Sequence, residues 1–93
     1  VFMIKKDKQK IIPAVTHVDG SGRLQTVSKK DNPRYWTLIA EFRALTGVPV
    51  VLNTSFNLKG EPVVMTPTDA IRTFNSSGLD ALVLGNWVLT KQD

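Results

Sequence analysis

The 93-residue sequence has no cysteine and a single histidine, His17. Without cysteine the chain can form no disulfide bond and supplies no thiolate metal ligand, a pattern that fits a reducing cytoplasm. One histidine also excludes a zinc site built from several imidazoles, and it excludes a catalytic pair of histidines. We therefore expect a cytoplasmic protein and no metal site within this chain.

Long hydrophobic runs are missing as well. No apolar run approaches the roughly 18 residues that a membrane-spanning helix needs, so we expect no membrane partner. The first residues, V-F-M-I-K-K, place their charges after the apolar positions and are not a signal peptide. Because the chain has no initiator Met and enters a strand-like run at once, we expect it to be a fragment of a longer protein.

The composition is that of an ordinary globular protein with a net positive charge. The apolar fraction is 42%, the charged fraction is 22% and the net charge is +4, so wholesale disorder is not expected. A chain of this length forms one domain or part of one, and we take residues 1–93 as a single domain. The positive charge suits phosphate-bearing partners, either nucleotides or nucleic acid, and is too mild to choose between them.

Two helices and a terminal hairpin are predicted from residue 31 onward. Asp31 or Asn32 can cap a helix that has Pro33 at its first position and ends at Gly47. Thr66 and Pro67 open a second helix that ends at residues 76–78. Residues 81–84 read as a strand of the buried type, and they are joined at Gly85 and Asn86 to a final strand, residues 87–90.

The remaining strands are predicted from apolar runs. Val48 to Leu52 reads as a strand buried on both faces, and residues 1–6 and 63–65 read as shorter strands. Residues 14–18 and 23–27 flank the turn D-G-S-G and indicate a strand–turn–strand unit. This order of elements predicts an α+β fold, in which a mixed, twisted sheet packs with two helices.

A polar loop follows the Val48–Leu52 run and is the main candidate for a binding site. An ordinary solvated turn has the same residue types. Alternatively, the amide and hydroxyl groups of this loop hold a carbonyl or phosphate oxygen, with Lys59 adding charge. The loop is not a Walker loop, and no base accompanies Ser55 unless His17 reaches it, so Ser55 is expected to donate a hydrogen bond rather than to act as a nucleophile. The binding candidates in the loop are Asn53, Thr54, Ser55, Asn57 and Lys59.

Arg23 and His17 form a second group around the glycine turn. Arg23 suits bidentate contact with phosphate or carboxylate, although a solvated strand arginine has the same appearance. His17 can pair with the carboxylate of Asp19, or it can serve a structural role by bonding to the glycine turn.

Several long motifs resemble one family. They are A-V-T-H-V-D-G-S-G-R-L-Q-T-V (14–27), N-P-R-Y-W (32–36), T-G-V-P-V-V-L-N-T-S-F-N-L-K-G-E-P-V-V (46–64), T-P-T-D-A-I-R-T-F (66–74) and S-G-L-D-A-L-V-L-G-N (77–86). In this order they resemble the carboxyl-terminal part of the carbamoyltransferases of the nodulation and antibiotic-tailoring type. Small departures are Lys59, where Arg is common, and Met65, where Cys is common.

The resemblance implies a two-domain enzyme. Its amino-terminal domain is similar to the Kae1 class, carries histidine-ligated iron and transfers the carbamoyl group to a hydroxyl. Its carboxyl-terminal domain resembles YrdC and makes carbamoyl adenylate from carbamoyl phosphate and ATP, with Mg²⁺ carried by the nucleotide. This chain would be the last part of that YrdC-like domain, inactive alone, with Arg23 and Ser55 as its catalytic members and Asn53 nearby.

Two other functions stay open. YrdC-like domains also occur in RNA-modification proteins, so a basic module could bind nucleotide or RNA without catalysis. Such binding would show aromatic side chains interleaved with basic ones. Trp36 and Trp87 are the only free candidates and neither has a basic cluster beside it in sequence, so nucleic acid is not the expected partner. A domain that only packs against a partner domain is the third alternative.

Overall fold

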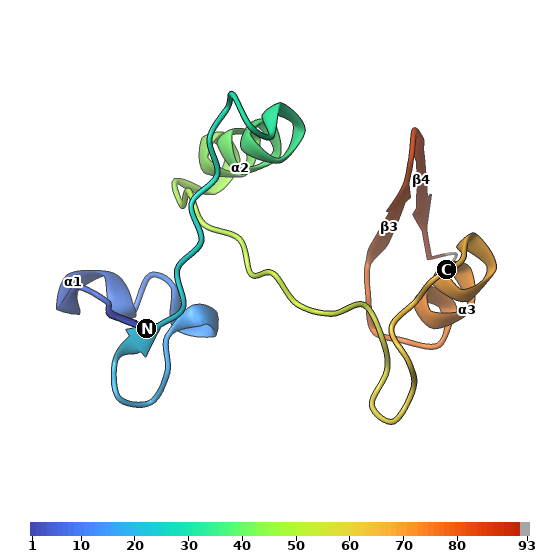
Figure 1. Ribbon diagram of the computed structural model, residues 1–93, viewed down its shortest axis with the longest axis horizontal. Helices are drawn as coiled ribbons and strands as arrows, with labels where there is room; N and C mark the ends of the chain where they lie inside the picture. Colours follow the sequence, from blue (N-terminus) through green and yellow to red (C-terminus); the bar gives the residue numbers. More distant parts are fainter. Residues whose placement is uncertain (92–93) are drawn as a thin grey trace. The chain divides into compact units, whose positions relative to one another are not determined.

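The computed structural model describes residues 1–91, and these form two compact units. The first unit is Val1–Asn53 and the second begins at Thr54. Each unit combines helical structure with one small antiparallel sheet (Figure 1), and the second unit has α3 (Pro67–Asn75) as its one described helix, which confirms the α+β class. The expected mixed sheet is wrong for the described residues, because they contain two separate two-stranded antiparallel sheets. That residues 1–93 make a single YrdC-like domain stays a prediction.

The first unit is built on a short strand pair. Strand β1 (Phe2–Met3) pairs with β2 (Ser21–Gly22), with Phe2 opposite Gly22. Helix α1 (Lys6–Gln9) and a 3₁₀ turn, η1 (Pro13–Val15), connect them. A side chain at Gly22 would lie 2.9 Å from Ile4 Cδ1 and 3.0 Å from the carbonyl oxygen of Val15, so glycine is what lets these segments approach. The expected strand–turn–strand unit of residues 14–27 is therefore wrong, because the glycine turn pairs with the start of the chain instead.

Helix α2 (Pro33–Thr46) belongs to the first unit and has the caps that the sequence predicts. The Asn32 side chain accepts a hydrogen bond from the backbone N–H of Tyr35 at 3.2 Å, and Gly47 takes the left-handed conformation with φ 78°. Its apolar side chains remain uncovered in this unit, since α2 has no buried residue and Leu45 is 84% exposed.

Residues 48–53 do not form the predicted buried strand. The segment has no regular structure, and Leu52 is 60% exposed. A strand is held by backbone hydrogen bonds to a neighbouring strand, and no described residue supplies them to this segment. The predicted strand at residues 63–65 is also absent, and a single bond from Val64 N–H to the Phe56 carbonyl at 2.9 Å closes that loop.

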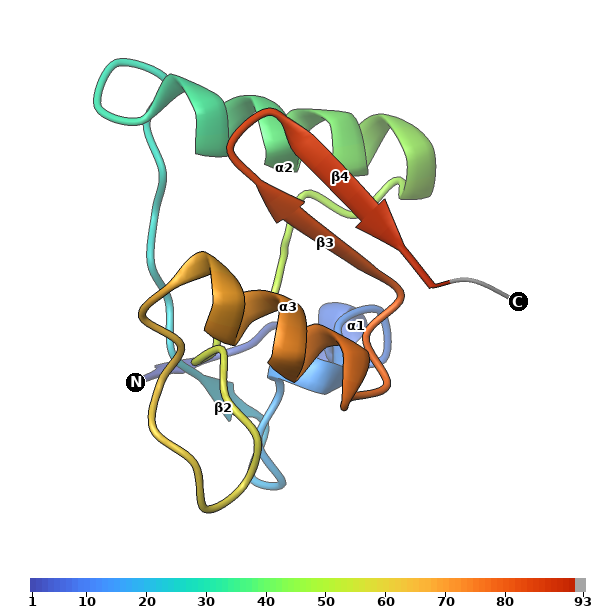
Figure 2. The same cartoon turned by 90° about the vertical axis from the view of Figure 1, so that its right-hand side faces the viewer.

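The second unit packs one helix on a hairpin (Figure 2). Helix α3 (Pro67–Asn75) begins where the Thr66 hydroxyl accepts from the Asp69 N–H at 3.1 Å, as predicted. Strands β3 (Ala81–Leu84) and β4 (Trp87–Thr90) pair antiparallel around Gly85, which has φ 58°. The core consists of Ala70, Phe74 and Leu82, with Phe56, Val64, Leu84 and Leu89 packed against it.

Strand β3 is buried on one side only, contrary to the expectation of a fully buried strand. Leu82 is 7% exposed and its neighbour Val83 is 66% exposed. This alternation is what a two-stranded sheet with a single helix on one face must show. None of the helices in residues 1–91 has the length and apolar character needed to cross a bilayer.

Candidate functional site

His17 sits in a tight turn that the sequence encodes locally. Its backbone N–H donates to the Ser21 carbonyl at 2.7 Å, and its carbonyl accepts from the Gly20 N–H at 2.9 Å. Gly20 has φ 86°, a conformation that favours glycine. The imidazole Nδ1 lies 3.1 Å from the Ser21 hydroxyl oxygen. His17 therefore bonds to the glycine turn, which is the structural alternative left open by the sequence.

Asp19 completes this turn through Ser21 rather than by direct contact with His17. One carboxylate oxygen of Asp19 accepts from the Ser21 hydroxyl at 2.6 Å and from the Ser21 backbone N–H at 3.0 Å. These two bonds, helped by the charge of His17, hold the pKa of Asp19 below its ordinary value. Ser21 is buried, with 4% of its surface exposed.

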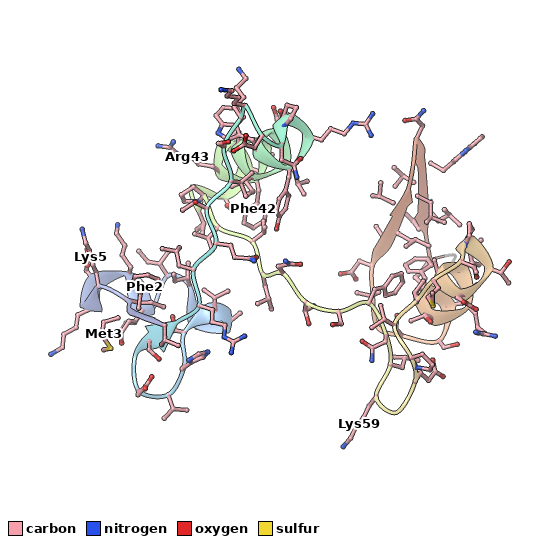
Figure 3. The ribbon with its side chains drawn as sticks, in the orientation of Figure 1. Phe2, Met3, Lys5, Phe42, Arg43 and Lys59 are labelled. Atoms are coloured by element: carbon pink, nitrogen blue, oxygen red, sulfur yellow. The ribbon has the colours of Figure 1, made fainter. Side chains whose placement is uncertain are left out.

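Arg23 follows strand β2 directly and is exposed. No described residue forms an ion pair or a hydrogen bond with its guanidinium. An open hollow of the first unit, here called the first-unit hollow, is lined by three of the predicted site residues, His17, Arg23 and Asn53. The same hollow is lined by further cations, Lys5, Lys8 and Arg43. Figure 3 shows the side chains of Lys5 and Arg43 on their elements.

Asn53 joins this group through one weak contact. Its side-chain amide nitrogen lies 3.4 Å from the Gln25 side-chain oxygen, so it links the end of the first unit to the segment just after Arg23. The structure thus brings together Asn53, Arg23 and His17, which are separated by up to 36 residues in sequence (53 − 17).

Thr54, Ser55 and Asn57 belong to the second unit and line a different, smaller hollow of about 570 Å³. Phe56, the residue that follows Ser55, packs against the α3–β3 core and so anchors the chain on that side of Ser55. Ser55 is exposed, and no described residue forms a hydrogen bond with its hydroxyl. Such a hydroxyl is available to a ligand. The second-unit hollow is lined by Thr54, Ser55, Phe56, Asn57, Leu58, Thr73, Ser77, Gly78 and Leu79.

Asn57 has a structural task within its loop. Its side-chain amide donates to the carbonyl oxygens of Leu58 and Glu61, each at 3.2 Å, and so closes the turn that contains Gly60. Lys59 extends from the tip of this loop, as Figure 3 shows, and is exposed. The Asn57 amide nitrogen therefore closes this loop, and a role of Asn57 in binding stays a prediction. None of the described residues forms an ion pair with Lys59.

The residue that the sequence analysis missed is Ser21. The sequence nevertheless contains a signal for it, since the spacing D-x-S is the pattern in which an aspartate side chain accepts a hydrogen bond from the backbone N–H two residues on. In residues 1–91 no cluster of three or more His, Cys, Asp or Glu residues could hold a metal ion.

Residues 1–91 match the family model described as "Carbamoyltransferase C-terminus". Nodulation protein NolO of Bradyrhizobium diazoefficiens is 47% identical over 92 residues, which is 99% of this chain and 17% of that protein. Nodulation protein NolNO of Sinorhizobium fredii is 48% identical over 99% of this chain and 14% of its own length. The 3'-hydroxymethylcephem-O-carbamoyltransferase of Amycolatopsis lactamdurans is 42% identical over 78% of this chain and 14% of its own length.

The chain thus spans less than a fifth of the length of each of these relatives. The family match, in contrast, runs through both units and includes every residue of the two hollows. This chain belongs to the carbamoyltransferase carboxyl-terminal family.

Proposed function

We propose that this chain is part of an O-carbamoyltransferase, in the domain that forms carbamoyl adenylate from carbamoyl phosphate and ATP before the carbamoyl group moves to a hydroxyl. The observation that carries the proposal is the family match over residues 1–91 together with Arg23 free and exposed on a cation-lined hollow. One relative is named for carbamoyl transfer, and we extend that activity to the longer protein expected to contain this chain.

The chemistry explains why cations are needed here. Carbamoyl phosphate, ATP and water give carbamoyl adenylate, pyrophosphate and phosphate, so two polyanionic substrates must lie side by side. Fixed positive groups offset that repulsion and stabilise the charge that develops on the departing pyrophosphate. Arg23, with its planar guanidinium, binds two phosphate or carbamoyl oxygens at once, and Lys5 and Lys8 add charge around the same hollow.

Ser55 has the supporting role of a hydrogen-bond donor. Its hydroxyl is exposed and its backbone is held by the adjacent Phe56 in the core. A donor held in this way stabilises a phosphate oxygen without needing a general base. His17, Asn53 and Thr54 are further contacts in the proposal, and Lys59 is an exposed charge at the loop tip.

The remaining parts of the proposal concern groups beyond this chain. ATP brings Mg²⁺ on its phosphate oxygens, and the complete domain has a YrdC-like fold. A Kae1-like amino-terminal domain of the same polypeptide carries the iron and the acceptor site. The enzyme works in the cytoplasm.

The test uses the full-length protein that contains this chain. Arg23→Ala should lower the rate of pyrophosphate release from ATP and carbamoyl phosphate by about tenfold to hundredfold, the loss expected for one charge-assisted contact. The matched control is Arg34→Ala, which removes an exposed arginine of α2 that does not line the hollow. Ser55→Ala should lower the rate less than Arg23→Ala, and its control is Ser76→Ala, a serine outside the second-unit hollow.

Equal rates in the Arg23→Ala and Arg34→Ala variants would contradict the role of Arg23. Calorimetric titration of both variants with ATP and with carbamoyl phosphate then shows which substrate Arg23 holds. Binding that weakens for one substrate only assigns the guanidinium to that substrate.

Nucleic-acid binding is the second candidate, and one contact bears on it. The Lys29 ammonium lies 5.1 Å from the centroid of the Trp36 ring, which puts a cation beside a partly exposed aromatic. The lysine covers one face of the ring that a base would need for stacking. A titration with single-stranded RNA at two salt concentrations decides the matter, since a steep loss of affinity with salt is the mark of phosphate contacts.

A further inference from the structure

A buried serine bridges a carboxylate and the only histidine of the chain. Ser21 is 4% exposed, its hydroxyl lies 2.6 Å from an Asp19 oxygen, and the same hydroxyl oxygen lies 3.1 Å from His17 Nδ1. His17 itself is exposed and lines the first-unit hollow, which Arg23 also lines. The three residues lie within five positions of one another in sequence. One of them, His17, lines the proposed substrate site.

The hydrogen bonds of Ser21 determine which ring nitrogen of His17 carries the proton when the imidazole is neutral. A serine hydroxyl has one proton to donate. The carboxylate of Asp19 has a lowered pKa, is ionised near neutral pH and can only accept, so that proton goes to Asp19. The Ser21 oxygen therefore accepts from His17 Nδ1, and when the imidazole carries a single proton that proton lies on Nδ1. Nε2 is then the ring nitrogen with the free lone pair.

A free acceptor has a specific use at a carbamoyl site. A carbamoyl group differs from an acetyl group in bearing an amino group, with two N–H donors, where acetyl has a methyl. Arginine and lysine have no acceptor and cannot recognise that amino group. A site built to accept from a substrate N–H rejects the analogue that lacks it far better than an apolar pocket rejects an extra methyl.

We propose that Ser21 and Asp19 are positioning residues that hold the His17 proton on Nδ1, so that Nε2 accepts a hydrogen bond from the amino group of the carbamoyl donor and selects it against acetyl phosphate. The assignment rests on the proposed function and adds to it the group that determines specificity. Arg23 binds the oxygens of the same substrate, and His17 accepts a hydrogen bond from its amino group.

Two substitutions at His17 separate the two ring nitrogens. An asparagine amide reaches the position of Nδ1, and a glutamine amide reaches the position of Nε2. In the full-length protein at pH 8, His17→Gln should keep most of the preference in kcat/KM for carbamoyl phosphate over acetyl phosphate. His17→Asn should lower that preference by about tenfold to hundredfold, as expected for the loss of one hydrogen bond to substrate.

Ser21→Ala tests the positioning directly. In ¹⁵N spectra of histidine-labelled protein, with His17 assigned by its disappearance in His17→Gln, the wild type should show a protonated Nδ1 and an unprotonated Nε2. Ser21→Ala should move His17 toward a mixture of tautomers and lower the carbamoyl preference by several-fold, about threefold to tenfold. Ser21→Thr keeps the hydroxyl, and where circular dichroism shows it folded it should restore the wild-type tautomer.

The outcomes are distinguishable. A wild-type Nε2–H tautomer, or an unchanged carbamoyl preference in His17→Asn, overturns the assignment of His17 and leaves adenylate formation standing. A full-length wild type that makes no carbamoyl adenylate overturns the proposed function and the ligand assignment together. A preference lost in His17→Asn and kept in His17→Gln supports the proposal.

Discussion

Phe74 is the residue on which the second unit depends most. It is 1% exposed, and among residues 1–91 the core around it contains just Ala70 and Leu82 as further buried apolar residues. Phe74→Ala should therefore cost this unit about 3–5 kcal/mol in its free energy of opening, through lost burial and the cavity left behind. With one tenfold change for each 1.4 kcal/mol or so, opening becomes about 10²- to 4 × 10³-fold more frequent.

The destabilisation caused by Phe74→Ala should extend through Phe56 to the loop that contains Ser55. Phe56 packs against the same core, and its carbonyl accepts from the Val64 N–H at 2.9 Å. Amide hydrogen exchange of Val64, measured in the full-length protein by mass spectrometry, should accelerate in Phe74→Ala together with the amides of α3. The loop that bears Ser55 is then ordered by the core and not by its own turn.

Phe74→Leu is the matched control, since it keeps most of the apolar volume. It should cost only about 1 kcal/mol and accelerate exchange by less than roughly tenfold. The reasoning is refuted if Phe74→Ala accelerates exchange in α3 while Val64 exchanges at the wild-type rate.

Three further changes test local features. Gly20→Ala should destabilise the protein by about 1–2 kcal/mol and lower its thermal unfolding midpoint, because φ is 86° there and a side chain would lie 2.8 Å from Gln9 Nε2. The control is Gly78→Ala, where a side chain would meet open space and the thermal midpoint should change little. Thr66→Ala should cost about 1 kcal/mol by removing the α3 cap, and Thr66→Ser should recover it in denaturant unfolding. Asp19 has a lowered pKa in the folded state, so the stability it contributes is present above its ordinary value of 3.8 and is lost as pH falls through the folded-state pKa. Between about pH 5 and about pH 3, Asp19→Asn should therefore lose less stability than the wild type, and an equal loss would contradict this.

Local signals in the sequence predicted helices α2 and α3 and the terminal hairpin, but not the short helix α1. The caps at Asn32 and Thr66, and the left-handed residue Gly47, depend on neighbours within a few positions. The pairing of β3 with β4 follows for the same reason, because a short turn at Gly85 sets its register.

The strands with distant partners could not be predicted in this way. The apolar run Val48–Leu52 has the composition of a buried strand, but composition does not say which segment would pair with it, and no described residue does. Strand β2 pairs with β1 because Gly22 admits Ile4, a contact across 18 residues (22 − 4) that no periodicity reveals.

In the candidate site, too, residue type predicts some members, whereas the role of others depends on contacts that only the fold creates. His17, Arg23 and Asn53 were selected by residue type, and the structure places them around one hollow. Asn57 was selected by the same reasoning and serves loop closure, because its amide meets two backbone carbonyls that only the folded turn brings near. Ser21 was passed over because a serine between two glycines reads as part of a turn, and its burial depends on the strand pair.

The products formed by the full-length wild-type protein from ATP and carbamoyl phosphate, with no acceptor added, test the central claim most directly. Mass spectrometry should find carbamoyl adenylate and an equal amount of pyrophosphate, with both sharply reduced in Arg23→Ala. Cleavage of ATP to ADP and phosphate, or ATP left intact beside active carbamoyl transfer, would contradict the account.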